Sequence, residues 1–147
     1  MIEVRGRIVS AVPLIDVIIR SEDDHGVVPI ELPSTALVDT GATASFVGGK
    51  TARQLGLSSS GKRLVRFGGD GEAMPKDRFV CEFAFVRTSP DGEPVPWPDL
   101  LLATEFDASN RPFDLILGMD VISHGELTLS RGETLSFRFP PPEPTKP

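Results

Sequence analysis

The chain has 147 residues, of which 39% are hydrophobic and 24% charged, and its formal net charge is −6. This length and composition predict a soluble globular protein whose core needs no disulfide or metal. The acidic balance, without any cluster of lysines and arginines, argues against nucleic-acid binding because nothing would neutralise the phosphates. No stretch approaches the ~18 apolar residues of a membrane helix, and the N-terminus lacks a signal-peptide pattern, so we expect a cytoplasmic protein without a membrane partner.

Strand patterns dominate the first part of the chain. Short β-branched runs predict strands over residues 4–13, 14–20, 27–32 and 35–38. A polar turn is expected over 21–26. The first helix is expected over 50–55, because Gly56 follows it as a C-terminal stop, and a loop follows over 58–62.

The rest of the chain also reads mainly as strands, expected over 63–67, 78–87, 100–106, 115–117, 126–129 and 133–139. The clearest of them alternates, and its period of two places four residues on one face: Phe79, Cys81, Phe83 and Phe85. Cys81 is the sole cysteine, so it has no disulfide partner within the chain, and we expect it to be a small core residue.

Turn signals separate these later strands. Asp70-Gly71 indicates a hairpin turn, since both residues tolerate positive φ. Four prolines between residues 88 and 99 predict a loop that also carries Trp97. A second short helix is expected over 119–124, ended by a glycine.

These elements predict an all-β fold with two short helices, which suits a small closed β-barrel. We expect a single domain over residues 1–139. The remaining segment, 140–147, is rich in proline and can enter neither sheet nor helix, so a disordered tail is expected.

The most informative motif begins in the strand before Asp39, where residues 36–43 read Ala-Leu-Val-Asp-Thr-Gly-Ala-Thr. An apolar strand that runs into an acid delivers one carboxylate to a water-poor place. Thr40 adds a hydroxyl group, and Gly41 lets the backbone come close, so short hydrogen bonds can hold the acid.

A second segment about 75 residues later, 113–122, is another apolar strand that ends at Gly118 and leads into a short helix. Together the two segments resemble the retropepsin-like aspartyl proteases, in particular the single-domain, homodimeric type with its bacterial and cellular members. Residues 13–19 resemble the strand before the catalytic loop of that family, and 51–57 resemble the helix after it. The resemblance covers most of the chain and implies the retropepsin-like acid protease fold.

The family implies roles for particular residues. Its catalytic motif falls on Asp39, Thr40 and Gly41, with Thr40 expected to bond the backbone of a partner subunit across a two-fold axis. Its substrate-binding residues, on the active loop and on a hairpin flap, fall on Ala42, Gly68, Gly69, Asp70 and Gly71. Leu117 and Gly118 are expected to be critical for the fold rather than for catalysis, because a side chain at Gly118 would collide with the Asp39 loop.

Peptide hydrolysis without a metal or a covalent nucleophile needs a base for water and an acid for the carbonyl oxygen. Two adjacent carboxylates that share one proton supply both, as in aspartic proteases. This chain has one such motif, since Asp114 and Asp120 lack the Thr-Gly context and read as loop or helix-capping acids. We therefore expect a homodimer that places two copies of Asp39 together, acts as an endopeptidase on a peptide or protein substrate, and needs no cofactor.

Two other interpretations remain open at this point. A catalytically inactive member of the same fold could serve as a peptide-binding or dimerisation module. A stand-alone β-barrel binding domain could carry the Asp-Thr-Gly motif by accident. A zinc site is not expected, because His25 and His124 have no cysteine or acidic partners at ligand spacing.

Overall fold

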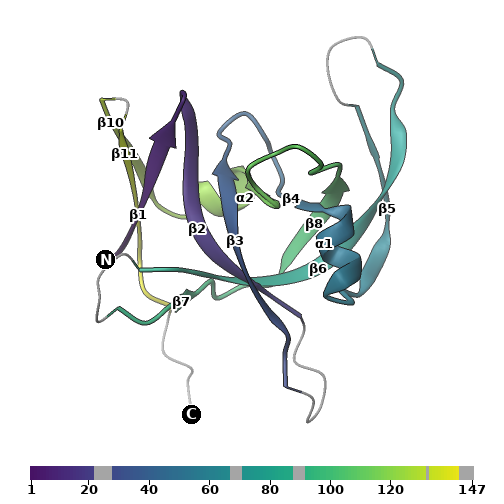
Figure 1. The fold of residues 1–147 in the computed structure, drawn as a ribbon, viewed down its shortest axis with the longest axis horizontal. Helices are drawn as coiled ribbons and strands as arrows, with labels where there is room; N and C mark the ends of the chain where they lie inside the picture. The colour runs from purple at the N-terminus through teal and green to yellow at the C-terminus, as the bar shows by residue number, and fades with distance from the viewer. Residues whose placement is uncertain (22–27, 67–70, 88–91, 132, 143–147) are drawn as a thin grey trace.

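The computed structural model describes residues 1–21, 28–66, 71–87, 92–131 and 133–142. Within these residues the strands form one 11-stranded sheet, accompanied by two short helices (Figure 1). The strands are β1 (Ile2–Val9), β2 (Val12–Arg20), β3 (Glu31–Val38), β4 (Phe46–Gly48), β5 (Ser59–Val65), β6 (Met74–Phe85), β7 (Val95–Pro96), β8 (Leu101–Phe106), β9 (Leu115–Leu117), β10 (Glu126–Ser130) and β11 (Thr134–Phe139). The helices are α1 (Gly49–Gln54) and α2 (Met119–Ile122). The prediction of a mostly β fold with two short helices is confirmed.

The strands follow the order β10-β11-β1-β2-β3-β9-β4-β8-β6-β5, and β2 pairs in addition with β6. Most neighbours are antiparallel, but β3 runs parallel to β9 and β4 runs parallel to β8. Strand β9 therefore lies between β3 and β4, although it comes from a distant part of the sequence. This insertion brings the two motif segments of the sequence side by side.

The main core takes most of its buried residues from β2, β3, β6, β8, β9 and β11. The alternating residues of β6 are all buried as their period predicts: Phe79, Cys81, Phe83 and Phe85. Trp97 stacks on Phe83 with ring centroids 6.0 Å apart and meets Phe85 edge-on at 6.1 Å. Burial raises the pKa of the Cys81 thiol to about 12, so this cysteine is a protonated core residue at neutral pH.

A second, smaller set of apolar residues packs on the other face of β3, and we call it the outer cluster. Leu14, Phe106 and Phe113 are its buried members. Half-buried neighbours complete it: Val12, Leu37, Phe46, Ala108 and Ile116. The sheet thus carries apolar side chains on both faces around β3 and β9, which allows the end of β3 to be shielded on two sides.

Some boundaries differ from the sequence expectations. The expected strand 4–13 is wrong, because the chain turns at Ser10 and Ala11 between β1 and β2, both with positive φ (50° and 64°). Neither residue is a usual left-handed turn former. The antiparallel pairing of β1 with β2 imposes this turn.

Two further segments are more ordered than expected. Strand β5 begins at Ser59, inside the expected loop 58–62, because its first residues pair with β6. The expected loop after β6 contains the short strand β7, in which Pro96 opposes Ala84 of β6.

In the described part of the chain, no helix is long and apolar enough to cross a membrane.

Candidate active site

Asp39 directly follows β3 and continues its pairing with β9. Val38 is paired with Leu117, and the Asp39 backbone N–H donates to the Leu117 carbonyl oxygen at 2.9 Å. Because side chains alternate along a strand, Leu37 and Asp39 share one face, whereas Val38 points into the core. The Asp39 side chain is half-buried, so the fold delivers this carboxylate to a partly shielded position beside the outer cluster.

The turn after Asp39 holds one of its two carboxylate oxygens. The Gly41 backbone N–H donates to Asp39 Oδ1 at 2.9 Å, and the Ala42 N–H donates to the Asp39 carbonyl oxygen at 3.2 Å. Within the described residues, Oδ2 accepts no hydrogen bond, so it is open to water or to a ligand. Thr40 and Gly41 are exposed and Ala42 is half-buried. A Cβ atom at Gly41 would lie 3.2 Å from Oδ1 and would crowd the oxygen that the turn holds.

Gly118 directly follows β9 and lies against the backbone of residues 42 and 44, just after this turn. A Cβ atom there would lie 2.7 Å from the carbonyl oxygen of Ala44 and 2.8 Å from that of Ala42, distances that real Cβ atoms do not adopt. The Met119 N–H also donates to the Ala42 carbonyl oxygen at 2.8 Å. Only glycine at this position lets the two segments approach so closely.

A hydrogen-bonded pair, buried Ser45 and half-buried Asp120, ties the loop to α2. Ser45 is fully buried, and it donates through Oγ to Asp120 Oδ1 at 2.7 Å and through its N–H to Oδ2 at 3.0 Å. Ser45 Oγ in turn accepts the Gly118 N–H at 3.1 Å. Asp120 lies in the first turn of α2, but the helix has no side-chain cap, so the helix-capping interpretation of this acid is wrong.

Sequence reasoning missed Ser45 altogether. Its partner lies 75 residues further along the chain, and neither residue has a local pattern that marks it. The other acid of the second segment, Asp114, accepts a hydrogen bond from Ser34 Oγ at 3.0 Å, as a loop acid. Both acids of the second segment are therefore bonded to serines rather than paired with Asp39.

Comparison with known proteins agrees with this arrangement. A family model described as aspartyl protease matches residues 29–121, which is more than half of the chain. The chain belongs to the aspartyl protease family. No curated protein matches the chain.

Among solved structures, a retropepsin-like aspartic protease from Rickettsia conorii matches with a TM-score of 0.56 and 12% sequence identity. The match covers 93% of this chain and 90% of that one. At so low an identity the likeness shows the fold alone. The retropepsin-like aspartyl protease family expected from the sequence is thus confirmed, and the fold of this family member is retropepsin-like.

The expected flap falls on the β5–β6 hairpin of this family member. Gly68, Gly69 and Asp70 lie outside the described residues, whereas Gly71 is described and exposed. The arms of the hairpin are antiparallel and are joined by an ion pair between Lys62 Nζ and Asp77 Oδ1 at 2.9 Å. In Figure 1 the end of β5, the start of β6 and the end of β3 face the same side of the molecule.

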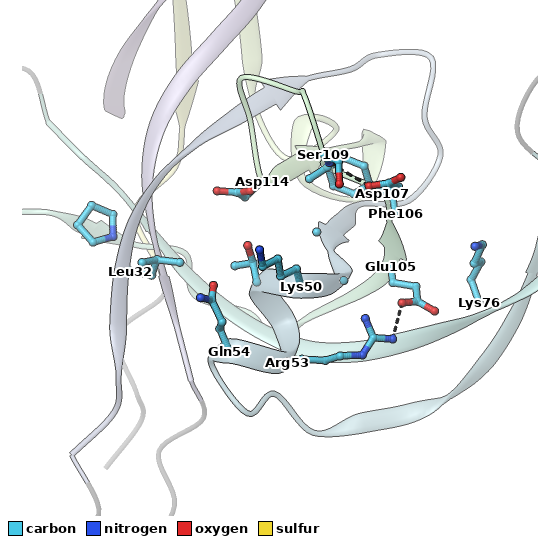
Figure 2. Close-up of a pocket in the computed structure, with 15 residues that line it drawn as sticks. Leu32, Lys50, Arg53, Gln54, Lys76, Glu105, Phe106, Asp107, Ser109 and Asp114 are labelled. Atoms are coloured by element: carbon cyan, nitrogen blue, oxygen red, sulfur yellow. Dashed lines mark hydrogen bonds and ion pairs between the residues drawn. The ribbon is translucent and has the colours of Figure 1, made fainter.

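One large cavity lies away from the Asp39 turn. Its volume is about 620 Å³, and no residue of the loop 39–45 lines it. Figure 2 shows side chains of α1, of the start of β3 and of the segment after β8 around it, with Arg53 Nη2 bonded to Glu105 Oε2 at 2.8 Å. In the described ranges, no group of three histidines, cysteines or acids is placed to hold a metal ion.

Proposed function

We propose that the protein is an aspartic endopeptidase that works as a homodimer, with the lytic water activated between two Asp39 carboxylates. The observation that carries this proposal is the geometry of Asp39 itself. Its carboxylate is half-buried at the end of a strand, one oxygen is held by the Gly41 N–H, and the other accepts no hydrogen bond within the described residues.

The dimer follows from counting catalytic acids. The chain contains one Asp-Thr-Gly motif, and its other acids near the second segment are bonded to Ser34 and Ser45. A two-fold axis beside the Asp39 turn would bring in the second carboxylate from an identical chain. Thr40 is exposed at the same turn, where its hydroxyl group can bond the partner's backbone and lock the two loops together.

The chemistry is that of aspartic proteases in general, in which two carboxylates so close cannot both ionise and share one proton. The ionised oxygen takes a proton from water while the protonated one donates to the peptide carbonyl oxygen. In this chain the Gly41 N–H fixes Oδ1, so the free oxygen of each Asp39 faces the water. Because the Asp39 carboxylate is already held in place, little rearrangement of this group is needed to reach the transition state.

The substrate is a peptide or protein in extended conformation. The active loop with Ala42 and the hairpin residues 68–71 contact it, and the hairpin opens and closes as a flap that donates backbone N–H groups. We also infer that residues 1–139 form one domain built on a closed barrel. The pairing of β2 with β6 supports this, because it returns the path β2-β3-β9-β4-β8-β6 to its start.

The test is cleavage of a peptide library by the wild-type protein and by Asp39→Asn. Loss of the dyad is expected to lower the rate by about 10²–10⁴-fold or more. Asp99→Asn serves as the matched control, since this substitution makes the same change of charge at an exposed residue outside the loop 39–45. Circular dichroism and sedimentation of all three proteins are expected to be unchanged.

Each failure of the proposal has its own signature. Equal cleavage by the wild type and Asp39→Asn would assign the activity to another group. Peptides that bind to the dimer and are never cut from acidic to neutral pH would identify the inactive binding or dimerisation module. A strict monomer at micromolar concentration would favour the stand-alone barrel, because it could not assemble two copies of Asp39.

A further inference from the structure

A second cavity, of about 400 Å³, lies on the face of the sheet that carries Asp39. Seven residues line it, four apolar and three charged: Leu37, Phe106, Phe113, Ile116, Lys76, Asp107 and Arg111. Leu37 and Ile116 are paired neighbours on β3 and β9. Leu37 precedes Asp39 by two residues, so the Cα atoms of these two residues lie roughly 7 Å apart along the strand.

The walls of this cavity are the open part of the outer cluster. Phe106 and Phe113 stack with ring centroids 6.0 Å apart, and each is less than a tenth exposed. Leu37 and Ile116 are only half-buried, so their remaining apolar surface faces the cavity. A leucine or phenylalanine side chain placed there would cover this surface, and such burial is the main source of affinity in apolar pockets.

The rim of the cavity carries unpaired positive charge. Within the described residues, neither Lys76 nor Arg111 forms an ion pair. The third charged group, Asp107, accepts the Ser109 N–H at 3.0 Å, and bonds from Ser109 hold the pKa of this carboxyl below its usual range, with a smaller contribution from the two cations. The rim therefore has one surplus positive charge in a chain whose net charge is −6.

We propose that this cavity selects peptides in which a large apolar residue next to the cleaved bond is flanked by an acidic residue. The inference rests on the proposed function, because it places the peptide bond at Asp39. The apolar side chain enters between Leu37, Phe113 and their neighbours, and the acidic side chain meets Lys76 and Arg111 at the rim. The overall negative charge of the protein would otherwise repel such a peptide, so the rim cations decide the preference.

Binding to the full-length Asp39→Asn variant tests this without depending on catalysis. Fluorescent peptides carry one leucine, with glutamate or lysine moved through the two positions on either side, and a matched set replaces leucine by alanine. We expect the best glutamate peptide to bind roughly three- to tenfold more tightly than its lysine counterpart, a preference that fades at high salt. The alanine set is expected to bind more weakly throughout.

Charge reversal on the protein supplies the decisive control. Arg111→Glu in the Asp39→Asn background is expected to abolish or reverse the preference for glutamate, and Lys76→Glu is expected to do the same. Arg5→Glu is the matched control, because Arg5 is also an exposed arginine, lies on β1 and does not line the cavity. It is expected to leave the preference unchanged.

Several outcomes would overturn the inference. Equal binding of the glutamate and lysine peptides would do so, as would no binding at all, or identical effects of Arg111→Glu and Arg5→Glu. The proposed function fails separately: if the wild type cuts none of these peptides while the charge preference holds, the cavity is a peptide-binding site without proteolysis. If the wild type cuts glutamate and lysine peptides equally well, proteolysis stands and the charge selection is wrong.

Discussion

The loop 39–45 is fastened on several sides, whereas β5 of the neighbouring hairpin has a single partner. Hydrogen bonds tie the loop to β9 and to the start of α2, and the buried Ser45 side chain closes the junction. Among the described residues β5 pairs with β6 alone, and its side chains are exposed or at most half-buried. Both parts are expected to contact the substrate, but the fold supports them very differently.

This contrast shows how a small domain can combine a rigidly held carboxylate with a hairpin that is able to move. A catalytic carboxylate gains from a geometry that does not change during the reaction. A cover must open and close, and such elements come from the least stable parts of a fold. The contrast predicts that substitutions in the loop junction cost stability and activity together, whereas substitutions in the hairpin lower activity with little loss of stability.

The largest effect is expected at the junction glycine. Gly118→Ala puts a Cβ atom 2.7 Å from the Ala44 carbonyl oxygen, and it is expected to lower the free energy of unfolding by about 3 kcal/mol in urea titrations. Gly56→Ala is the matched control, because Gly56 has open space around its Cβ position but a φ of +63°. Its expected cost is about 1 kcal/mol, from backbone strain alone. Equal costs at the two glycines would contradict a close crossing.

The pair of buried Ser45 and half-buried Asp120 is expected to rank next. Asp120→Ala leaves the Ser45 hydroxyl and N–H without an acceptor in a buried position, at a cost of about 2 kcal/mol. In a double-mutant cycle, Asp120→Ala and Ser45→Ala are expected to be strongly non-additive, whereas Glu133→Ala, at an exposed acid in the turn between β10 and β11, adds independently. Additive effects of Ser45 and Asp120 would mean that the pair does not fasten the loop.

A substitution in the hairpin sharpens the comparison from the other side. Leu64 is 70% exposed near the end of β5, so Leu64→Ser is expected to change the free energy of unfolding by no more than about 0.5 kcal/mol. The value of kcat/KM for a peptide is expected to fall by about tenfold, mainly through KM, because the leucine is covered when substrate binds. Leu129→Ser, at a similarly exposed leucine on β10, is expected to change neither quantity. A loss of stability at Leu64 without a loss of activity would break the comparison.

The smallest effect concerns the ion pair within the hairpin. The Lys62 ammonium group, chiefly through its hydrogen bond, lowers the pKa of Asp77 in the folded state. A lowered folded pKa stabilises the protein above the unfolded pKa, near 3.8, and this stabilisation is lost as the pH falls through the folded value. Asp77→Asn is therefore expected to be slightly less stable than the wild type at neutral pH and equally stable at about pH 2. A deficit that persists in acid would assign the effect to packing.

The parts of the fold that the sequence predicted well depend on local chemistry. The apolar run before Asp39, the alternation along β6 and both short helices rest on periodicity or on a glycine stop, and each is present in the structure. The family was also identified from two short motifs, and the family model confirms it. The roles of the individual site residues remain predictions, and the flap residues Gly68, Gly69 and Asp70 lie outside the described part of the chain.

What the sequence did not reveal depends on contacts between distant segments. The turn at Ser10 and Ala11 forms without a turn-forming residue, because the pairing of β1 with β2 demands it. The bond between Ser45 and Asp120 exists only because β9 inserts beside β3 and carries α2 to the loop. Sequence patterns over a few residues do not indicate such long-range contacts. This explains why Asp120, which bonds Ser45 of the loop, was interpreted as a helix-capping acid.

The most direct test of the central claim, that Asp39 acts with its own copy, is a subunit-mixing experiment. A fixed amount of wild-type chain is equilibrated with a ninefold excess of Asp39→Asn chain, and peptide cleavage is measured. If each active site needs both carboxylates, random exchange leaves about a tenth of the wild-type chains in active dimers, and the rate falls to roughly that fraction. A ninefold excess of Asp99→Asn chain is expected to raise the rate instead. A rate unaffected by the Asp39→Asn chain, although exchange is shown by mass-labelled subunits, would contradict the account.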